Sequence, residues 1–407
     1  MRKMNRELFQ DLKVADFAWM QSAPVTAALL ADFGATVVRV EDRALPCSTR
    51  TLGPYKDGIP GIDRSGFFTI MNPNKYSITL NLDMPQDLEA AKKLIAWSDI
   101  VIQSFSTGTM ERKWGLGYES LKKIKEDIIM VSPSIQGQTG IHSAFRGIGP
   151  NVNALTGLAN LLGWPDRDIT SMANPYSDWL QPCFTIGAIA TALEYRRRTG
   201  KGQQIDSTQF ENTAILFSLP LIDCFVNNRV LKRSGNRHPD AAPHGVYRCQ
   251  GDDEWCTIAI FHDTEWKAFC KAIGNPLLTD RPNFATLSER KCHEDELDRL
   301  VEVWTINLSS QEVMERLQEA GVAAGQVKSN KGLYEDVHVA SRQFFQPVEH
   351  PEVGTYQWFS WPFQLSKVSP EPGPAPRMGE HNSYICKEIL GLYDEEFNKL
   401  SQTTLSK

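Results

Sequence analysis

One carboxylate, that of Asp178, stands among aromatic residues in a stretch whose composition points to chemistry. Tyr176 precedes it, Trp179 follows it, and Pro182 opens a helix that is built largely from small residues. The dipole of a helix favours a negative charge at its N-terminus, and an ionised carboxylate is the form that nucleophilic catalysis needs. The alternative interpretation of Asp178 is a helix cap or a loop residue, since Asp is a preferred capping residue.

An alternation of strand and helix signals occupies the first half of the chain. Short apolar or β-branched runs predict strands, and apolar residues at helical spacing predict helices. The expected strands cover residues 12–17, 36–40, 77–82, 99–103 and 128–132, and the expected helices cover 24–33 and 86–97. This order predicts an α/β fold with an open, mostly parallel sheet. The first strand is not followed by G-x-G-x-x-G, which disfavours a nicotinamide or flavin cofactor.

The character of the sequence changes after Asn228. Residues 1–228 form the first part of the expected large domain, and residues 229–325 a smaller α+β domain, with a hairpin over 244–260 and three helices at 264–273, 293–305 and 310–320. The segment 326–407 starts with an aromatic, strand-like stretch at 344–363. It then passes through four prolines, which exclude a regular helix there, and ends in a helix over 381–390.

The overall composition is that of a soluble globular protein, with 41% hydrophobic and 23% charged residues. The net charge of −6 disfavours nucleic acid or an anionic membrane as a partner. We find no signal peptide and no apolar run long enough to span a bilayer. The eight cysteines show no C-x-x-C spacing. We therefore expect reduced thiols, no metal site and a cytoplasmic location.

Several segments, in a fixed order, carry a resemblance to a known family. They read DLKVADFAWMQSAPVTAALLADFGATVVRVED, NPNKYSITLNL, SFSTGTMERKWGLGYES, RRRTGKGQQIDSTQFE and PAPRMGEHN. Together they resemble the family III CoA-transferases, a group that includes formyl-CoA and carnitine-CoA transferases and alpha-methylacyl-CoA racemase. The resemblance covers nearly the whole chain. It implies a Rossmann-like large domain, a small domain, a C-terminal segment that returns to the large one, and a homodimer of two interlinked subunits.

The resemblance also implies roles for individual residues. Asp178 matches the family nucleophile, which attacks an acyl-CoA thioester and carries CoA as an aspartyl-CoA thioester until an acceptor carboxylic acid takes it over. CoA is then a substrate, and no prosthetic group is implied. The residues that match the CoA-binding motifs are Gln21, Ser22, Arg39, Lys75, Phe105 and Arg112. By residue type alone, solvated surface charge is the favoured interpretation of the three cations, and a core position that of Phe105.

Departures from the family pattern bear on function. Trp19 stands where formyl-CoA transferase-like members have His, and residues 234–245 lack the glycine run of the loop that covers the site in many members. Pro150 takes the position of the racemase His and has no titratable group, so it cannot move an α-proton. Asn151 replaces the acid beside it. The alternatives to a CoA-transferase are an acyl-CoA racemase and a non-catalytic CoA-binding protein.

Overall fold

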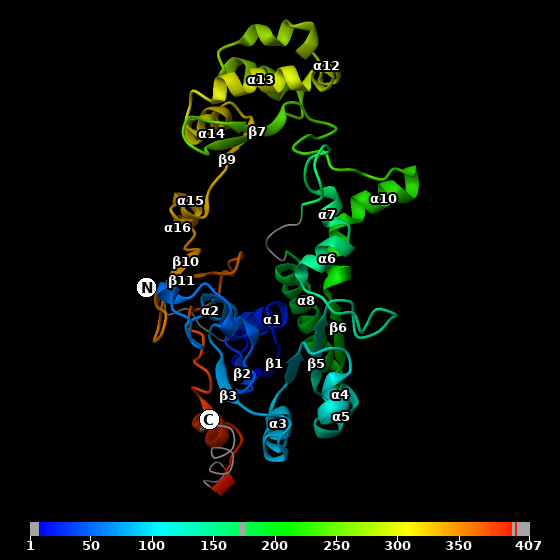
Figure 1. Cartoon of the computed structure of the whole chain (residues 1–407), viewed down its shortest axis with the longest axis vertical. Helices are drawn as coiled ribbons and strands as arrows, with labels where there is room; N and C mark the ends of the chain where they lie inside the picture. The colour runs from blue at the N-terminus through cyan, green and yellow to red at the C-terminus, as the bar shows by residue number, and fades with distance from the viewer. Residues whose placement is uncertain (1–7, 171–175, 393–394, 397–407) are drawn as a thin grey trace. The chain divides into compact units, whose positions relative to one another are not determined.

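The computed structural model describes residues 8–170, 176–392 and 395–396, which belong to two compact units (Figure 1). Unit 1 contains Met1–Ala159, Ser171–Val230 and Ser341–Lys407, and unit 2 contains Asn160–Thr170 and Leu231–Ala340. The chain therefore enters unit 2 twice, first for a short segment and then for most of that unit, and it returns to unit 1 each time.

A six-stranded sheet forms the centre of unit 1. Its strands follow the order β3-β2-β1-β4-β5-β6, and each neighbouring pair is parallel. Their bounds are Lys13–Phe17 (β1), Thr36–Glu41 (β2), Tyr76–Thr79 (β3), Ile100–Gln103 (β4), Ile129–Ser134 (β5) and Gln204–Thr208 (β6). The α/β prediction with a parallel sheet is confirmed. Chain order reverses between β1 and β4, and a crevice at the carboxyl ends of the strands is where such sheets bind ligands.

Helices cover both faces of this sheet. On one face, α1 (Ser22–Asp32) and α8 (Tyr176–Thr199) pack against Val14, Ile100 and other alternate strand residues. On the other face, α3 (Pro85–Trp97), α4 (Thr109–Trp114) and α5 (Tyr118–Ile124) pack against Ala15, Val101 and their neighbours. Because side chains alternate along a strand, buried strands that feed two cores must be apolar at nearly every position.

Short helices complete unit 1. They are α2 (Gly66–Met71), α6 (Gly149–Leu155), α9 (Gln209–Ala214) and α10 (Ser218–Asn227), with α7 (Leu158–Leu161) at the passage to unit 2 and single turns over Ser48–Thr51, Lys56–Gly58 and Ile215–Phe217. The C-terminal segment adds the antiparallel pair β10 (Phe345–His350) and β11 (Gly354–Phe359), then α17 (Asn382–Tyr384) and a π-helical turn at Ile385–Ile389. The strand-like stretch at 344–363 and the last helix are confirmed.

Unit 2 has its own sheet and core. The sheet order is β7-β8-β9, with bounds His244–Arg248, Trp255–Ala259 and Ala323–Gln326, and both pairings are antiparallel. Its helices are α11 (Asp263–Ala272), α12 (Leu287–Cys292), α13 (Glu294–Thr305), α14 (Ser310–Glu319), α15 (Asn330–Tyr334) and α16 (Val337–Ser341), with single turns at Pro276–Asp280 and Pro282–Phe284. Trp266, Phe269 and Phe284 are fully buried in the core that these elements enclose. The expected hairpin and α+β character are confirmed.

Across the described residues, no helix combines the length and the hydropathy that a bilayer span requires.

Candidate active site

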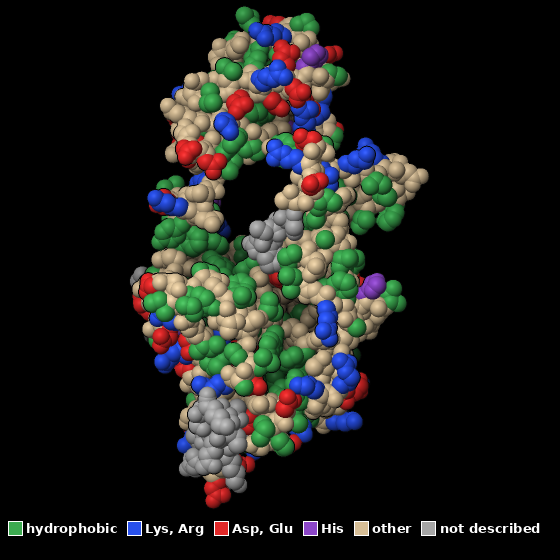
Figure 2. All heavy atoms as spheres, viewed as in Figure 1, with side chains coloured by type: hydrophobic (Ala, Val, Ile, Leu, Met, Phe, Trp, Pro, Cys, Tyr) green, Lys and Arg blue, Asp and Glu red, His purple; other side chains and the backbone are tan. Residues whose placement is uncertain are grey.

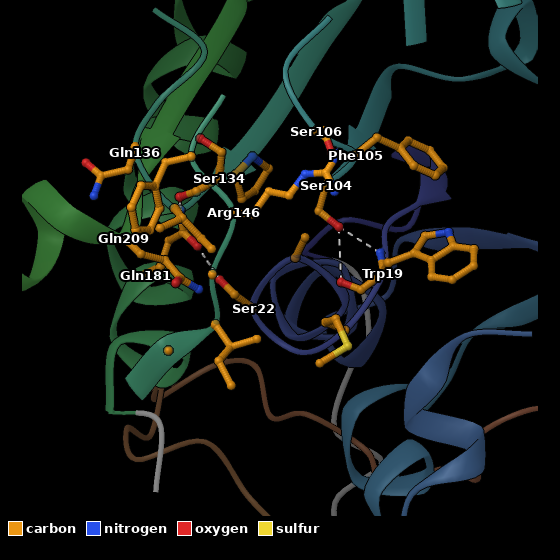
Figure 3. A pocket seen from close by; sticks show the side chains of 18 of the residues that line it. Trp19, Ser22, Ser104, Phe105, Ser106, Ser134, Gln136, Arg146, Gln181 and Gln209 are labelled. Atoms are coloured by element: carbon orange, nitrogen blue, oxygen red, sulfur yellow. Dashed lines mark hydrogen bonds between the residues drawn. The ribbon is translucent and has the colours of Figure 1, made fainter. Parts of the chain in front are cut away.

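A cavity of about 310 Å³ opens at the carboxyl ends of β1, β4 and β5 in unit 1 (Figure 3). It is lined by the segments that follow those strands, residues 19–23, 104–107, 133–136 and 143–149, together with Asp178, Gln181 and Gln209. Most of the lining side chains are serines, glutamines and aromatic residues. Among the described residues that line the cavity, Asp178 is the one acid and Arg146 the one base.

Asp178 lies in the first turn of α8, where the helix dipole favours its charge. Its side chain is half-buried, and burial raises the pKa of this carboxyl to about 6, although a hydrogen bond from Gln209 lowers it in part. The carboxylate is therefore mostly ionised at neutral pH and poorly solvated, which is the condition of a reactive nucleophile. Tyr176, Trp179 and Pro182, expected in a loop at the mouth of the helix, lie within α8 itself, so the helix begins earlier than predicted. Residues 172–175 of the same stretch lie outside the described residues.

The local sequence brings Asp178 to the cavity through two neighbouring elements. Pro182 lies inside α8, four residues after Asp178. Strand β6 leads into α9, whose first residue, Gln209, is 6% exposed and donates a hydrogen bond from Nε2 to Oδ1 of Asp178. Thr208 caps α9 by accepting from the amide of Glu211 at 3.3 Å, and this cap fixes where the helix begins.

Gln181 ties α8 to the rest of the cavity wall. It is 1% exposed, and its Nε2 donates to the carbonyl oxygen of Ser207 at 2.8 Å. Its Oε1 accepts from the hydroxyl of Ser22 at 2.5 Å (Figure 3). One amide thus links α8, β6 and the start of α1. Gln181, Gln209 and Arg146 were not predicted from the sequence, because a polar residue beside a strand end has no spacing that marks it as part of a site.

Three of the six residues expected to bind CoA line this cavity with Asp178: Gln21, Ser22 and Phe105. Ser104 holds the loop after β1 in place, since its hydroxyl donates to the Trp19 carbonyl at 3.0 Å and accepts from the Trp19 amide at 2.7 Å (Figure 3). The rings of Trp19 and Phe105 lie 6.2 Å apart. Trp19, at the position of the family His, is therefore part of an aromatic wall.

The same wall borders a second cavity, of about 330 Å³, at the carboxyl ends of β2 and β3. Trp19 and Phe105 line both cavities. The second one adds Trp114, Leu80 and Leu82, with Asp42, Asp83 and Lys113 at polar positions. An aromatic and aliphatic lining of this kind suits a flat ring system better than a free phosphate.

Arg39 and Lys75 lie elsewhere than expected. Both are buried, at 0% and 4% exposure, and neither lines the two cavities. The Lys75 ammonium donates to Asp16 at 2.7 Å, and the Arg39 guanidinium donates to the same oxygen at 3.3 Å. Asp16 is fully buried in β1, so its charge requires these cations. The structure does not bring either cation to the cavity, because both are engaged beneath it.

Arg112, the sixth expected CoA-binding residue, lies in α4 and is exposed. Its guanidinium donates to the carbonyl of Thr107 at 2.8 Å, and Thr107 lines the first cavity. Arg112 therefore stands next to the cavity without being part of its wall. No group of three or more His, Cys, Asp or Glu side chains within the described ranges is arranged to hold a metal ion.

Comparison with known proteins adds to this geometry. The family profile described as CoA-transferase family III matches residues 9–382. The chain belongs to CoA-transferase family III. It is 30% identical over 394 residues to succinyl-CoA–D-citramalate CoA-transferase of Chloroflexus aurantiacus, covering 96% of each chain. It is 28% identical over 415 residues to formyl-CoA:oxalate CoA-transferase of Streptomyces coelicolor, covering 98% of this chain and 99% of the relative.

A solved structure agrees with the assignment. The crystal structure of a CAIB/BAIF family protein from Brucella suis superposes with a TM-score of 0.84 at 27% identity, covering 93% of this chain and 98% of that one. The resemblance found in the sequence is thereby confirmed, and the protein is a family III CoA-transferase. The α/β fold described above is the fold of this structural relative as well.

Pro150 and Asn151, at which the sequence departs from the expected racemase pattern, lie next to the cavity. Pro150 and Asn151 belong to the first turn of α6, and Asn151 Oδ1 accepts from the amide of Ile148 at 2.9 Å. Asn151 therefore serves as a helix cap. Among the described residues that line the cavity of this CoA-transferase there is no histidine. Within the described part of the wall, the cavity offers one carboxylate and no histidine to act as its partner in acid–base chemistry.

Proposed function

We propose that this CoA-transferase moves CoA from an acyl-CoA donor to a carboxylic acid acceptor through an aspartyl-CoA thioester on Asp178. The observation that carries the proposal is a half-buried carboxylate at the wall of a cavity of ligand size, with a neutral amide as its hydrogen-bond donor. A poorly solvated carboxylate attacks a thioester more readily than a hydrated one. An acyl-CoA racemase is disfavoured by Pro150 and by the absence of a lining histidine among the described residues.

The reaction divides into balanced steps. One oxygen of Asp178 attacks the donor acyl carbon, the C–S bond breaks, and CoA leaves as a thiolate, which gives a mixed anhydride. The thiolate then attacks the aspartyl carbon and expels the donor acid. The acceptor carboxylate attacks the aspartyl carbon of the thioester, the C–S bond breaks, and the thiolate leaves a second mixed anhydride behind. The thiolate then attacks the acceptor acyl carbon, which forms the new acyl-CoA and releases the Asp178 carboxylate. Together these steps replace one difficult exchange by several easier ones. Water must be excluded from the site, because it would hydrolyse the anhydride and the thioester.

The proposal is tested by trapping the covalent enzyme. Incubation with succinyl-CoA and borohydride, followed by peptide mass spectrometry, should modify Asp178 in the wild-type protein. Asp178→Ala should give no adduct while still binding CoA. A wild-type protein that binds CoA, gives no adduct and shows no exchange would be the non-catalytic binder. Incorporation of deuterium from D₂O at the α-carbon of an acyl-CoA would indicate the racemase.

We propose that CoA extends along the two cavities that share Trp19 and Phe105. The pantetheine arm would then lie beside Gln21, Ser22 and Phe105, with its thiol near Asp178, and the adenine ring would stack in the aromatic second cavity. Arg112 stays a proposed phosphate contact because its guanidinium is exposed next to the first cavity. Arg39 and Lys75 are left out of this proposal, since their charges are paired with Asp16.

For the substrates, we propose acids that carry two carboxylates. The name of one relative pairs succinyl-CoA with D-citramalate, and the name of the other pairs formyl-CoA with oxalate. Citramalate and oxalate are both dicarboxylic acids. Arg146, exposed at the wall of the first cavity, offers a guanidinium that pairs with the second carboxylate. Arg146→Met should raise the KM for succinate about tenfold, and that for butyrate much less. Arg197→Met, which changes an exposed arginine outside both cavities, is the matched control.

We propose a homodimer in the cytoplasm. Helix α10 has no buried residue, and Leu219, Phe225 and Val226 are 78%, 78% and 74% exposed, so hydrophobic side chains gather on this helix (Figure 2). A second copy of the chain would bury this surface. Light scattering after size exclusion should give the mass of a dimer. Phe225→Asp should shift that mass toward a monomer, and Lys122→Asp should not.

The cytoplasmic location is supported by the cysteines. All eight carry free thiols, as a reducing compartment allows.

A further inference from the structure

Two glutamines, Gln209 and Gln181, are almost fully buried at the wall of the cavity, yet their amides are used differently. The Gln181 amide is saturated: it bonds the Ser22 hydroxyl and the carbonyl oxygens of Ser207 and Ser134. These bonds hold α1, α8 and β6 together, which is a structural use of a buried amide. A buried polar group that is fully bonded stabilises the fold and needs no other explanation.

Gln209 shows the opposite pattern. Its Nε2 donates to Oδ1 of Asp178, while its Oε1 is buried without a hydrogen-bond partner among the described residues. Burying half an amide unpaired costs free energy, on the order of 1–3 kcal/mol. The unpaired Oε1 of Gln209 therefore lowers the stability of the fold. A catalytic role is one explanation for an unsatisfied buried group, and what singles out Gln209 is that its one partner is Asp178, the proposed nucleophile.

We propose that Gln209 is an oxyanion donor for the reaction of Asp178, a proposal that rests on the function proposed above. The atom that becomes charged identifies this role. After Asp178 has attacked through its other oxygen, Oδ1 is the carbonyl oxygen of the anhydride. When the thiolate adds to the aspartyl carbon, the electrons of that carbonyl move onto Oδ1. The Nε2–H of Gln209 already points at this oxygen, so no group has to reorganise as the charge develops.

The burial of Gln209 is consistent with this role. An oxyanion donor for a substrate carbonyl has to be reachable from the cavity, but here the oxyanion forms on the enzyme's own side chain. Gln209 can thus be 6% exposed and still contact the reacting atom. The collapse of each tetrahedral intermediate returns the electrons to the carbonyl and expels either the donor carboxylate or the CoA thiolate. The Gln209 amide therefore stabilises the oxyanion in every step in which a nucleophile attacks the aspartyl carbon.

The test compares Gln209→Met with the wild type and with Thr213→Val. Met keeps the length and volume of the side chain and removes the donor. Thr213 is a fully buried residue of the same helix that lines neither cavity, so its variant controls for changes in α9. We expect Gln209→Met to lower kcat for CoA exchange about 10²–10³-fold, with the dissociation constant for CoA changed less than about threefold. Thr213→Val should stay within about threefold in kcat.

The pH profile separates a donor from a merely structural residue. The hydrogen bond from Gln209 lowers the pKa of Asp178, so its loss should move the acid limb of the profile to higher pH. If Gln209→Met does not fold, Gln209→Glu tests whether Gln209 acts as a hydrogen-bond donor. The carboxyl group that this substitution introduces can donate only when protonated, so the activity of the variant relative to wild type should fall as pH rises from about 5 to about 8.

The two proposals fail in distinguishable ways. A wild-type protein that forms no borohydride-trapped adduct with succinyl-CoA would refute the transferase mechanism. A different result would overturn only the role of Gln209. In that case the wild-type protein forms the adduct, while Gln209→Met keeps kcat within threefold of wild type and shows the acid limb of its pH profile at the wild-type position. For Gln209→Glu, a pH profile parallel to that of the wild type would do the same.

Discussion

Asp16 and Asp178 are two carboxylates of the same unit that meet opposite surroundings. Asp16 is fully buried in β1, and two cations, Arg39 and Lys75, lie within 3.3 Å of its Oδ2. Asp178 is half-buried in α8, and the hydrogen bond that lowers its pKa comes from a neutral amide. The charge of the first carboxylate is compensated by buried cations, while no cation among the described residues is paired with the second. In the mechanism proposed here, the first acid contributes to stability and the second to reactivity.

Asp16 also supports the site indirectly. Its Oδ1 accepts from the amide of Ala18 at 2.9 Å, at the start of the loop that carries Trp19 and Gln21 to the cavity. Lys75, which is bonded to Asp16, also donates to the Pro24 carbonyl at 2.8 Å, in the first turn of α1. Burial of Lys75 lowers its pKa to about 8 in spite of Asp16. The cations expected to bind phosphate therefore hold the loop that lines the cavity.

The largest effect should come from Asp178→Asn, which removes the charge and keeps the shape. Without a nucleophile, CoA exchange should fall at least about 10⁴-fold in a coupled assay with succinyl-CoA. Asp206→Asn, which changes an exposed acid outside both cavities, is the control and should keep most of the activity. Retention of exchange by Asp178→Asn would remove the distinction between the two carboxylates.

Asp16→Asn should act on stability instead. Lys75 would be left buried without its counter-ion, and Arg39 would keep only Glu41, at 3.4 Å. Breaking a buried ion pair typically costs about 3–5 kcal/mol. Urea unfolding followed by circular dichroism measures the loss. An unchanged unfolding midpoint would show that the cluster contributes nothing to folding and would contradict the role given to it here.

The pH dependence of the covalent step should report Asp178. Because burial raises its pKa to about 6, the rate of adduct formation should be level above pH 7 and fall about tenfold for each pH unit below about 6. Rapid-quench trapping with succinyl-CoA between pH 4.5 and 8 measures this limb. A limb centred near pH 4 would indicate a well-solvated carboxylate.

The smallest effect is a gain of stability in Asp178→Asn. The folded-state pKa of Asp178 lies above that of an unfolded Asp, so the stability due to this group is fully present below about pH 4 and is lost as pH rises through about 6. Asn does not ionise, so the variant should be more stable than wild type at pH 8, by about 1 kcal/mol after allowance for partial exposure. The difference should vanish near pH 4. Asp16→Asn, in contrast, should be less stable than wild type at pH 8.

Much of the fold followed from pattern alone. Five of the six strands of the central sheet lie where apolar, β-branched runs predicted them, because parallel strands buried on both faces read as continuous apolar sequence. Strand β6 was missed. Its sequence, Gln204–Thr208, is polar at several positions, and Gln204 and Asp206 are exposed. Pattern analysis detects burial, which β6 lacks in its first half, whereas β3, at the other edge of the sheet, is largely buried and was predicted.

The site was harder to predict, for a physical reason. Sequence resemblance brought Gln21, Ser22, Phe105 and Asp178 into one prediction, and they do line one cavity. Whether a cation binds a ligand or an internal acid depends on what lies beneath it, which spacing does not reveal. The one available signal was Asp16, an acid within the buried run VADF, because such an acid requires a buried cation.

The proline inside α8 removes a hydrogen bond from the turn that carries Asp178. Pro182 has no N–H, so the backbone carbonyl of Asp178 lacks the hydrogen bond that the residue four positions later normally donates. The first turn of the helix therefore has one backbone hydrogen bond fewer to the turn that follows it. In the proposed mechanism this side chain carries a bulky thioester and then returns, and a first turn with one hydrogen bond fewer would let it move while the rest of the helix keeps its packing on the sheet.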